Sequence, residues 1–368
     1  MDCNSENLRE LPLVELHKAA GAKFGAFAGW NMPLTYPMGV LKEHLHTRAS
    51  AGLFDISHMK LILVSGADVD AFLTFALPLD PALDNISQSR YSYLLNDNGG
   101  ILDDLIVTKL GGNRFMIVVN ASNAEADIKE LKHRAQNFNC QLEPLDRVLL
   151  ALQGPKAAEV LKDLDIDFGN LTFMHGFEPK PGWFISRSGY TGEDGFEIAM
   201  PLADAAAFAE KLVDDPRIEW IGLAARDSLR LEAGLCLHGN DITVHDNPVE
   251  AGLTWALTTT VREKAAFVGA KALLGALARP PSRRRVGLKP ETKMPVRHGA
   301  EIFDQAGKKV GIVTSGGFGP SFGGPVAMGY VSTECAKVGT LLKTSVRGKE
   351  IGLSVFKLPF VAQRYFKG

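Results

Sequence analysis

The chain has 368 residues, of which 46% are hydrophobic and 22% charged, the composition of an ordinary globular protein. At roughly 150 residues per domain, this length predicts two or three domains rather than a single core. Forty lysine and arginine residues nearly balance 42 aspartate and glutamate residues, for a formal net charge of -2. A nucleic-acid-binding protein usually carries a basic excess, so this balance disfavours that class.

The cysteines, the histidines and the hydropathy pattern each narrow the class of protein. The four cysteines form no CxxC pair, which favours free thiols over a disulfide framework. The histidines lack metal-ligand spacing, so we expect no bound metal. The N-terminus has no apolar core of signal-peptide length, and no later segment approaches 18 uninterrupted apolar residues. We therefore expect a soluble, cytoplasmic protein that does not contact a membrane.

The first sixty residues predict two helices separated by a loop. Helices are expected at residues 12–20 and 41–51. Between them, the glycine- and proline-rich stretch 21–37 predicts a loop packed against other elements. A short turn at residues 54–59 then leads into a strand rich in β-branched residues.

The next part of the chain predicts an α+β unit. Residues 67–77 form an amphipathic helix pattern, and residues 91–110 predict two strands joined across NDNGG, a turn whose residues accept positive φ. A strand at 114–120 and a helix at 121–138 follow. The candidate N-caps of that helix are Asn120, Ser122 and Asn123. Strand, helix, hairpin, strand and helix in this order are typical of a ferredoxin-like unit.

A second unit of the same kind follows. Residues 148–164 predict a strand, a Gly-Pro turn and a helix, residues 183–201 a hairpin with a long turn, and residues 202–215 a helix of strong propensity. The two units look like loosely related halves, although no residue-level repeat joins them.

The clearest linker is the stretch 278–288, in which two prolines and four arginines interrupt all periodicity. Its arginine cluster could bind an anion, but a solvated linker is the favoured interpretation. Beyond it, short β-rich runs alternate with glycine turns, which predicts a small all-β barrel.

The stretch GGILDDLIV, residues 99–107, places two adjacent carboxylates inside an apolar run. In a strand, Asp103 and Asp104 must point to opposite faces, and neither face is otherwise polar. A carboxylate on an apolar face loses solvation, so it must find a hydrogen-bond partner, take up a proton or meet a ligand. The residues alone leave these three outcomes open.

Two further stretches contain charged side chains suited to a ligand. In SRSGYTGEDGFEI, Glu197 returns to a strand and could accept two parallel N–H bonds from an amidine-like edge. In GLAARDSLRLEAGL, Arg226 could grip a carboxylate with two hydrogen bonds. The plain alternatives are a solvent-facing hairpin for Glu197 and a salt bridge to Asp227 for Arg226.

Common catalytic motifs are absent from the sequence. It contains no GxGxxG between strand and helix, no GxxxxGK[ST], no GxSxG and no HExxH. The run Asp55, Ser57, His58 is too compressed to give the geometry of a catalytic triad by itself. We therefore expect His58 to be structural.

Taken together, these stretches resemble the aminomethyltransferase, or T-protein, family of the glycine cleavage system. The motifs that carry the resemblance run through the chain in the order FAGWNMP, FDISHM, NDNGGILDDLIV, LALQGP, SGYTGEDGFEI, GLAARDSLRLEAGL, NPVEAGLTW, TSG and PFV. The resemblance implies an α+β fold of three domains arranged like a clover leaf around a folate-binding centre. The implied domains are 1–51 plus 147–250, a ferredoxin-like 52–146 to which 251–278 is a candidate addition, and a C-terminal β-barrel at 279–368.

The resemblance also implies a reaction. The family transfers the methylene carbon of an aminomethyl group from the lipoyl arm of H-protein to tetrahydrofolate, which releases ammonia and forms 5,10-methylenetetrahydrofolate. Tetrahydrofolate would be the co-substrate and lipoylated H-protein the partner, with no metal. Two alternatives are a folate-dependent demethylase of another amine or sulfonium donor, and a non-catalytic folate-binding accessory protein. The absence of a cysteine from GYTGEDG disfavours the accessory protein.

Site residues follow from the resemblance by position. Asp104 matches the catalytic aspartate and Asp103 its structural partner. Glu197 matches the glutamate that holds the pterin, and Arg226 matches the arginine that grips the glutamyl carboxylate of folate. The aromatic residues implied to line the folate site or contact substrate are Tyr91, Tyr190 and Tyr365.

Overall fold

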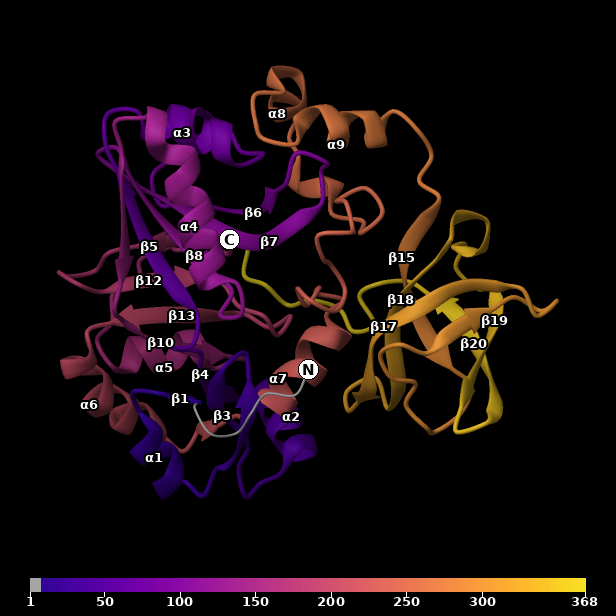
Figure 1. The fold of residues 1–368 in the computed structure, drawn as a ribbon. Helices are drawn as coiled ribbons and strands as arrows, with labels where there is room; N and C mark the ends of the chain where they lie inside the picture. The colour runs from indigo at the N-terminus through magenta and orange to yellow at the C-terminus, as the bar shows by residue number, and fades with distance from the viewer. Residues whose placement is uncertain (1–7) are drawn as a thin grey trace.

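Four sheets organise residues 8–368, the part of the chain that this computed structural model describes. A six-stranded sheet and a five-stranded sheet form the two neighbouring α+β lobes of Figure 1. A closed six-stranded barrel forms a third, all-β lobe. A three-stranded sheet lies near the N-terminus. This is the mixed α and β architecture with a C-terminal barrel that the sequence predicts. Within the described residues, no helix is both long enough and apolar enough to cross a membrane.

The N-terminal segment corrects one prediction, because the expected loop at 21–37 contains a hairpin. Ala28 and Gly29 occupy positive φ, at 50° and 79°, as a tight two-residue hairpin turn requires. The small residues that suggested a loop therefore permit a sharp reversal between two strands. The segment contains β1 (Arg9–Glu10), α1 (Val14–Ala19), β2 (Lys23–Phe27), β3 (Trp30–Thr35) and α2 (Val40–Ala49).

The six-stranded sheet has the order β11-β12-β13-β10-β4-β14. Its strands are β4 (Ala51–Asp55), β10 (Val148–Gln153), β11 (His175–Phe177), β12 (Phe184–Arg187), β13 (Gly195–Met200) and β14 (Ile218–Trp220). Two helices connect them, α5 (Ala157–Asp163) and α6 (Leu202–Val213). Without β4 and the edge strand β11 this is a ferredoxin-like order. Because β4 pairs with β10, we propose that the first domain boundary lies after residue 55 rather than after residue 51.

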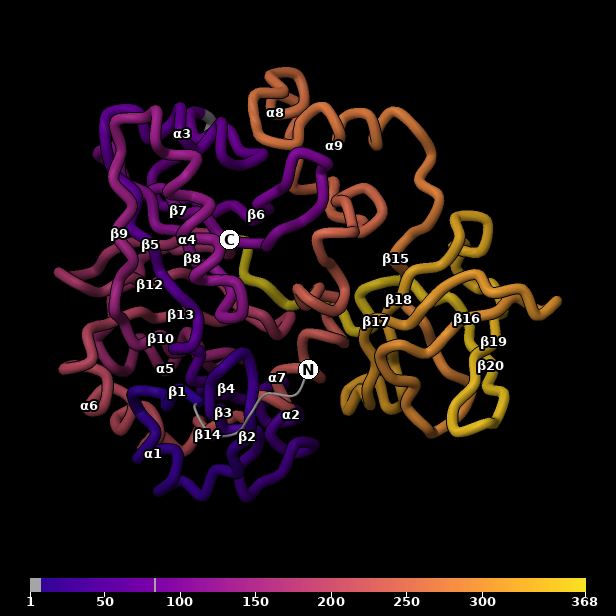
Figure 2. The backbone as a smooth tube through the Cα atoms, in the orientation of Figure 1, coloured from indigo at the N-terminus to yellow at the C-terminus, as the bar shows by residue number. Residues whose placement is uncertain are grey.

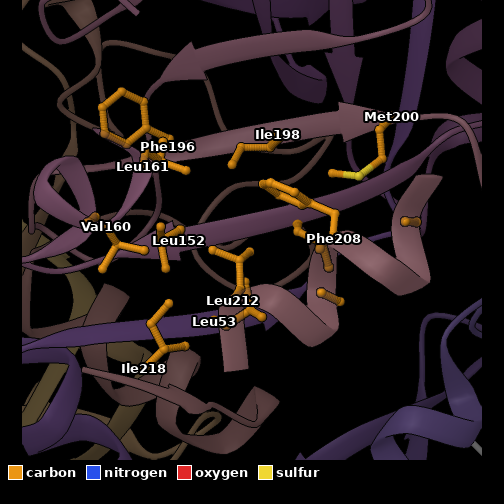
Figure 3. Close-up of a cluster of buried hydrophobic side chains, with 14 of the residues drawn as sticks. Leu53, Leu152, Val160, Leu161, Phe196, Ile198, Met200, Phe208, Leu212 and Ile218 are labelled. Atoms are coloured by element: carbon orange, nitrogen blue, oxygen red, sulfur yellow. The ribbon is translucent and has the colours of Figure 1, made fainter. Parts of the chain in front are cut away.

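One face of this sheet packs on α5 and α6 (Figure 3). Leu152 of β10 lies in that cluster and is fully buried. The alternate residues Leu149 and Ala151 belong to a second cluster on the opposite face. Strand β10 is buried on both faces, which explains its uninterrupted apolar sequence.

The five-stranded sheet has the order β6-β7-β8-β5-β9, which is a ferredoxin-like order with β6 added at one edge. Its elements are β5 (Lys60–Ser65), α3 (Val69–Ala76), β6 (Ser89–Leu95), β7 (Ile101–Gly111), β8 (Arg114–Val119), α4 (Ala124–Arg134) and β9 (Gln141–Leu145). The predicted NDNGG turn joins β6 and β7. In it, the Asn96 side chain accepts hydrogen bonds from the backbone N–H groups of Asn98 and Gly100, both at 2.9 Å.

Three helices lie between the α+β lobes and the barrel in sequence: α7 (Leu223–Glu232), α8 (Thr259–Lys264) and α9 (Ala270–Leu277). Helix α7 contacts α2, β3 and the barrel strand β17. Helices α8 and α9 share a buried cluster with Tyr93 of β6 and Ile101 of β7. That packing supports the placement of residues 251–278 with the second domain, which we propose.

The barrel closes in the order β15-β18-β17-β16-β19-β20. Its strands are β15 (Arg283–Pro290), β16 (Glu301–Phe303), β17 (Lys309–Gly319), β18 (Gly324–Ser332), β19 (Leu341–Val346) and β20 (Lys349–Phe356). Short 3₁₀ helices complete the described elements at Pro81–Leu83, Ala135–Asn137, Thr254–Ala256 and Thr333–Cys335.

Three of the four arginines of the predicted linker lie in β15, and the assignment to a solvated linker is wrong for Arg283 and Arg285. Arg283 pairs with Asp246 at 2.8 Å and with Glu250 at 3.1 Å. Arg285 donates to the carbonyl oxygens of Ala251 and Gly234 at 2.8 and 3.1 Å. Strand alternation points both side chains to the same side of β15. The groups that accept their hydrogen bonds there belong to residues 234–251, which are distant in sequence.

After β20 the chain leaves the barrel and returns to the α+β lobes, as the yellow end of the tube in Figure 2 shows. The backbone N–H of Arg364 donates to the carbonyl of Gly192 at 2.8 Å, and that of Phe173 donates to the carbonyl of Phe366 at 2.8 Å. The C-terminal residues therefore lie against the loop between β12 and β13.

We expect Leu152→Ala to lower the free energy of unfolding by about 2–5 kcal/mol, because it leaves a cavity in a core that cannot fully collapse. Chemical denaturation followed by circular dichroism measures this change. The matched control is Leu202→Ala, at a side chain that is 60% exposed, and its effect should stay within about 0.5 kcal/mol. Equal losses for the two variants would contradict the assignment of the core.

Candidate active site

Strand alternation sends the two adjacent acids of β7 to different places. Asp103 lies on the face that packs on α3 and α4, together with Leu105 and Val107. Asp104 lies on the opposite face. Because Ile106 pairs with Val118 on β8, this is the face whose residues Met116 and Val118 pack towards the six-stranded sheet and α7. The Asp104 side chain therefore points into the space between the two sheets.

Asp104 is held by two side-chain donors. The Tyr91 hydroxyl donates to Oδ2 at 2.8 Å, and the Asn120 amide donates to Oδ1 at 2.8 Å. Burial is the main reason that the pKa of Asp104 is raised to about 6, and the neighbouring charge of Asp103 raises it further. The two hydrogen bonds act in the opposite direction. The carboxylate is thus oriented, poorly hydrated and ionised at neutral pH.

Asp103 is fully buried and bonded within the protein. It accepts hydrogen bonds from the side-chain amides of Asn120 and Asn123, both at 2.9 Å. Asn123 occupies the N-cap position of α4 without making a side-chain capping bond. The prediction of Asn123 as an N-cap is therefore confirmed by position, but its side chain makes no capping bond, because its amide donates to the buried Asp103 carboxyl group. The second donor contact of Asn123 is to His238, at 2.8 Å.

Aromatic rings extend from the Asp104 side of the site. The Tyr91 ring stacks on Trp255, with centroids 5.2 Å apart and planes 24° apart. Trp255 is 68% exposed, an unusual setting for a large ring. The pair offers a flat apolar surface next to the carboxylate.

Glu197 points into the same space from the six-stranded sheet. It pairs with Ala151 on β10, and Ala151 pairs with Phe54 on β4, so the three residues lie in one row on one face. Ala151 and Phe54 belong to the cluster that includes Ala225 of α7. The Ser188 hydroxyl donates to Glu197 Oε2 at 2.9 Å. Burial raises the pKa of Glu197, and the positive charge of Arg226 opposes this rise.

Arg226 projects from α7 and is 9% exposed. Its Nη1 atom is buried and has no hydrogen-bond partner within the described residues. The predicted alternative, a salt bridge to Asp227, does not form, because Asp227 pairs with Arg230 at 2.8 Å. The guanidinium carbon lies 4.9 Å from the centroid of the Tyr190 ring. Burial lowers the pKa of Arg226, and the negative charge of Glu197 opposes this fall.

His58 lines a small cavity together with Arg226, Phe54 and Leu223. Its Nδ1 atom also has no partner within the described residues. Burial and then the charge of Arg226 lower the pKa of His58 to about 3, so the imidazole is neutral. The neutral imidazole therefore contributes no charge that could pair with Arg226.

The Tyr190 hydroxyl donates to the carbonyl oxygen of Cys236. Cys236 packs in the buried cluster that contains Tyr93 and touches Tyr91. Tyr190 therefore lies between Arg226 on one side and the Tyr91 and Asp104 pair on the other. The structure brings together Asp104, Tyr91, Tyr190, Glu197 and Arg226.

Tyr365 occupies a different setting from these five residues. Its ring stacks on Phe173, with centroids 3.8 Å apart and planes 7° apart. Within residues 8–368, no hydrogen bond or ring contact joins it to Asp104, Glu197 or Arg226. The tail that carries Tyr365 packs beside the loop that contains Tyr190. Its role in substrate contact stays a prediction.

Metal-binding geometry is not found in the described part of the chain, where no group of three or more histidine, cysteine, aspartate or glutamate side chains could hold an ion.

Comparisons with known proteins agree over the whole chain. The GCVT N-terminal domain family matches residues 13–260, and the glycine cleavage T-protein C-terminal barrel domain family matches residues 283–362. The chain belongs to the glycine cleavage T-protein family. The human protein named "Aminomethyltransferase, mitochondrial" is 42% identical over 100% of this chain and 93% of its own length. The aminomethyltransferase of Saccharopolyspora erythraea is 38% identical over 96% of this chain and 98% of its own length.

A crystal structure of a T-protein family member shows the same fold. The glycine cleavage system aminomethyltransferase T from Bartonella henselae is 66% identical and has a TM-score of 0.97, over 98% of this chain and 100% of that chain. Membership of this family of aminomethyltransferases makes the chain a transferase, and it does not favour the demethylase or the accessory protein.

Sequence reasoning missed several residues that complete this T-protein site. Asn120 was expected only as a cap, and Trp255 and Ser188 were not singled out. A tryptophan in NPVEAGLTW and an asparagine directly after a predicted strand were the available signals. Neither signal predicts which residue the side chain contacts, because Trp255 and Tyr91 are separated by more than 150 residues of sequence.

We expect Tyr91→Phe to move the acid limb of the pH profile of methylene transfer to higher pH. The hydroxyl stabilises the charged form of Asp104, so its loss raises the pKa above about 6. Initial rates between pH 5 and pH 8 measure the shift. The matched control is Tyr93→Phe, because the Tyr93 hydroxyl donates to the carbonyl of Leu253 at 2.7 Å and not to an acid. An unmoved limb in Tyr91→Phe would show that Asp104 does not set the profile.

Proposed function

We propose that this chain transfers the methylene carbon of the aminomethyl group on the lipoyl arm of H-protein to tetrahydrofolate, with release of ammonia. Family membership supports the class of reaction. The observation that carries the proposal is the Asp104 carboxylate, which is oriented by Tyr91 and Asn120 and faces the space shared with Glu197 and Arg226. An ionised group kept in so poorly hydrated a position is typical of a functional site.

The residues of this space fit tetrahydrofolate. The carboxylate of Glu197 can accept two N–H bonds from the amino-pyrimidine edge of a pterin. Arg226 is a buried cation whose Nη1 lacks a partner in the described chain, and it can bind an oxygen acceptor of the ligand. Tyr190 and the stacked Tyr91 and Trp255 rings can border the flat ring system. When bound, tetrahydrofolate supplies the nitrogens that accept the carbon.

Asp104 acts first as an electrostatic group in this proposal. Its negative charge lies in a poorly hydrated setting, where it stabilises positive charge that develops nearby more strongly than it would in water. The hydrogen bonds from Tyr91 and Asn120 fix its direction before the reaction begins. A pKa of about 6 also allows Asp104 to accept or return a proton near neutral pH.

Lipoylated H-protein is the partner that this reaction requires, and we propose no nucleic-acid or membrane partner. The cytoplasmic location stays a prediction. The human relative is named as mitochondrial, whereas the name of the Saccharopolyspora erythraea relative gives no compartment.

Mixing the protein with tetrahydrofolate and aminomethyl-loaded H-protein tests the proposed function directly. We expect ammonia and 5,10-methylenetetrahydrofolate in equal amounts. Folate binding without either product would favour a non-catalytic folate-binding protein instead.

We expect Asp104→Asn to reduce turnover by roughly 100- to 1,000-fold, as loss of one preorganised electrostatic group typically does. The fold should persist. Because the pKa of Asp104 is raised by folding, its ionisation opposes the folded state as the pH rises from about 4 through about 6. The variant should therefore be at least as stable as the parent at pH 8, as measured by thermal denaturation.

The matched control for this substitution is Asp97→Asn, at an exposed position of the same hairpin turn. It makes the same change of charge, and we expect the parent rate of methylene transfer. Full activity of Asp104→Asn would remove Asp104 from the proposed mechanism.

A further inference from the structure

A third buried acid lies behind the two carboxyl groups of β7. Asp127 belongs to α4 and is 2% exposed. It precedes Leu131 by one helical turn, and Leu131 packs in the cluster that α4 shares with Leu105 of β7. Asp127 therefore faces the side of β7 on which Asp103 lies, and a hydrogen bond joins the two side chains. No step of the proposed reaction uses this residue.

The hydrogen bond between Asp103 and Asp127 requires a proton, because an ionised carboxylate only accepts. Asp103 accepts from the backbone N–H of Asn120 at 3.2 Å and from the side-chain amides of Asn120 and Asn123, both at 2.9 Å. Asp127 Oδ2 is buried and receives no bond from an N–H or hydroxyl group within residues 8–368. Since donors stabilise the charged form of a carboxyl group, the negative charge belongs on Asp103 and the proton on Asp127.

The cluster formed by Asp103, Asp104 and Asp127 has little positive charge around it. Among residues 8–368, no lysine or arginine forms an ion pair with any of these three acids. The titratable groups that face the cluster from other elements are Tyr91 of β6, which donates to Asp104, and His238, which lies 3.8 Å from Asp103. Burial, and next the hydrogen bond and the charge of Asp103, raise the pKa of Asp127 to about 10.

We propose that Asp127 keeps its proton and donates it in a hydrogen bond to Asp103, so that one permanent negative charge lies behind Asp104 instead of two. Asp127 is then a positioning residue, because it acts on the site through Asp103. The charge of Asp103 already raises the pKa of Asp104. A charge on Asp127 would raise it further, because the charges of Asp104 and Asp127 also oppose one another. A neutral Asp127 therefore allows Asp104 to be ionised at neutral pH.

The pH profile of methylene transfer tests how Asp127 acts, and this test rests on the proposed function. Asp127→Asn retains a neutral N–H donor to Asp103, so we expect the acid limb to stay where it is in the parent. Asp127→Leu removes the donor and leaves the charge of Asp103 less compensated, so its acid limb should move to higher pH. An ionised Asp127 would give the opposite sign, because both variants would then move the limb to lower pH, by roughly one unit or more. That result, or an unmoved limb in Asp127→Leu, would overturn the proposal.

The pH dependence of stability tests the proton on Asp127 without requiring activity. Folding raises the pKa of Asp127 to about 10, so the folded chain holds a proton that the unfolded chain releases above about pH 4. Asp127→Asn removes this cost. We expect its melting temperature to gain on that of the parent by a margin that grows between pH 4 and pH 8. The matched control is Glu125→Gln, in the same turn of α4 with a side chain 88% exposed, and its margin should not grow. A margin for Asp127→Asn that is independent of pH would contradict the proposal.

Infrared difference spectra at pH 8 locate the proton directly. A protonated carboxyl group has a C=O stretching band that a carboxylate lacks. We expect this band in the spectrum of the parent minus that of Asp127→Asn, but not in the parent minus Asp104→Asn, because Asp104 is ionised at that pH. The proposal would be wrong if the first difference lacked the band, or if Asp127→Asn kept the band and Asp103→Asn lost it. If the parent formed no methylenetetrahydrofolate, the proposed function would fail, and the spectra and melting curves would still decide whether Asp127 holds a proton.

Discussion

Two adjacent carboxylates in a buried strand are the constraint on which the site depends. Alternation along β7 separates Asp103 from Asp104, and Asn120 contacts both at 2.8–2.9 Å. Because two carboxyl groups removed from water are costly, the protein must supply hydrogen-bond donors for both of them. Asp103 accepts from Asn120 and Asn123, and Asp104 accepts from Asn120 and Tyr91. Asp104 retains a raised pKa and faces the space between the sheets.

Helix α7 connects this space to the rest of the molecule and uses its charged residues in two ways. Glu232 is fully buried and accepts hydrogen bonds from His44, Arg48 and the backbone N–H groups of Ser321 and Phe322. This network joins α2, α7 and the barrel, and its cost of desolvation is met by several bonds with defined geometry. Arg226 on the same helix has no hydrogen-bond partner for Nη1 in the described part of the chain. The helix is thus anchored at one end and offers a ligand-binding cation near the other.

Local signals predicted the elements around the site more successfully than their contacts. The NDNGG turn, the helix at α6 and the glycine-turn pattern of the barrel follow from residue preferences that act over a few positions. The stretch 21–37 was mistaken for a loop because glycine serves both loops and tight hairpin turns. Arg283 of β15 was mistaken for a solvated residue because its ion-pair partners, Asp246 and Glu250, lie far from it in sequence.

The sequence by itself determined that Asp103 and Asp104 point in opposite directions, since alternation is a property of any strand, and that Glu197 follows a long turn. It also determined the family, through motifs spread along the whole chain. Only the tertiary structure decided which donors each acid receives and that Arg226 Nη1 has no hydrogen-bond partner within residues 8–368. It also decided that Glu197 lies about two strand spacings from Phe54, which lines the cavity of Arg226. These facts depend on packing between segments distant in sequence, for which local propensity carries no information.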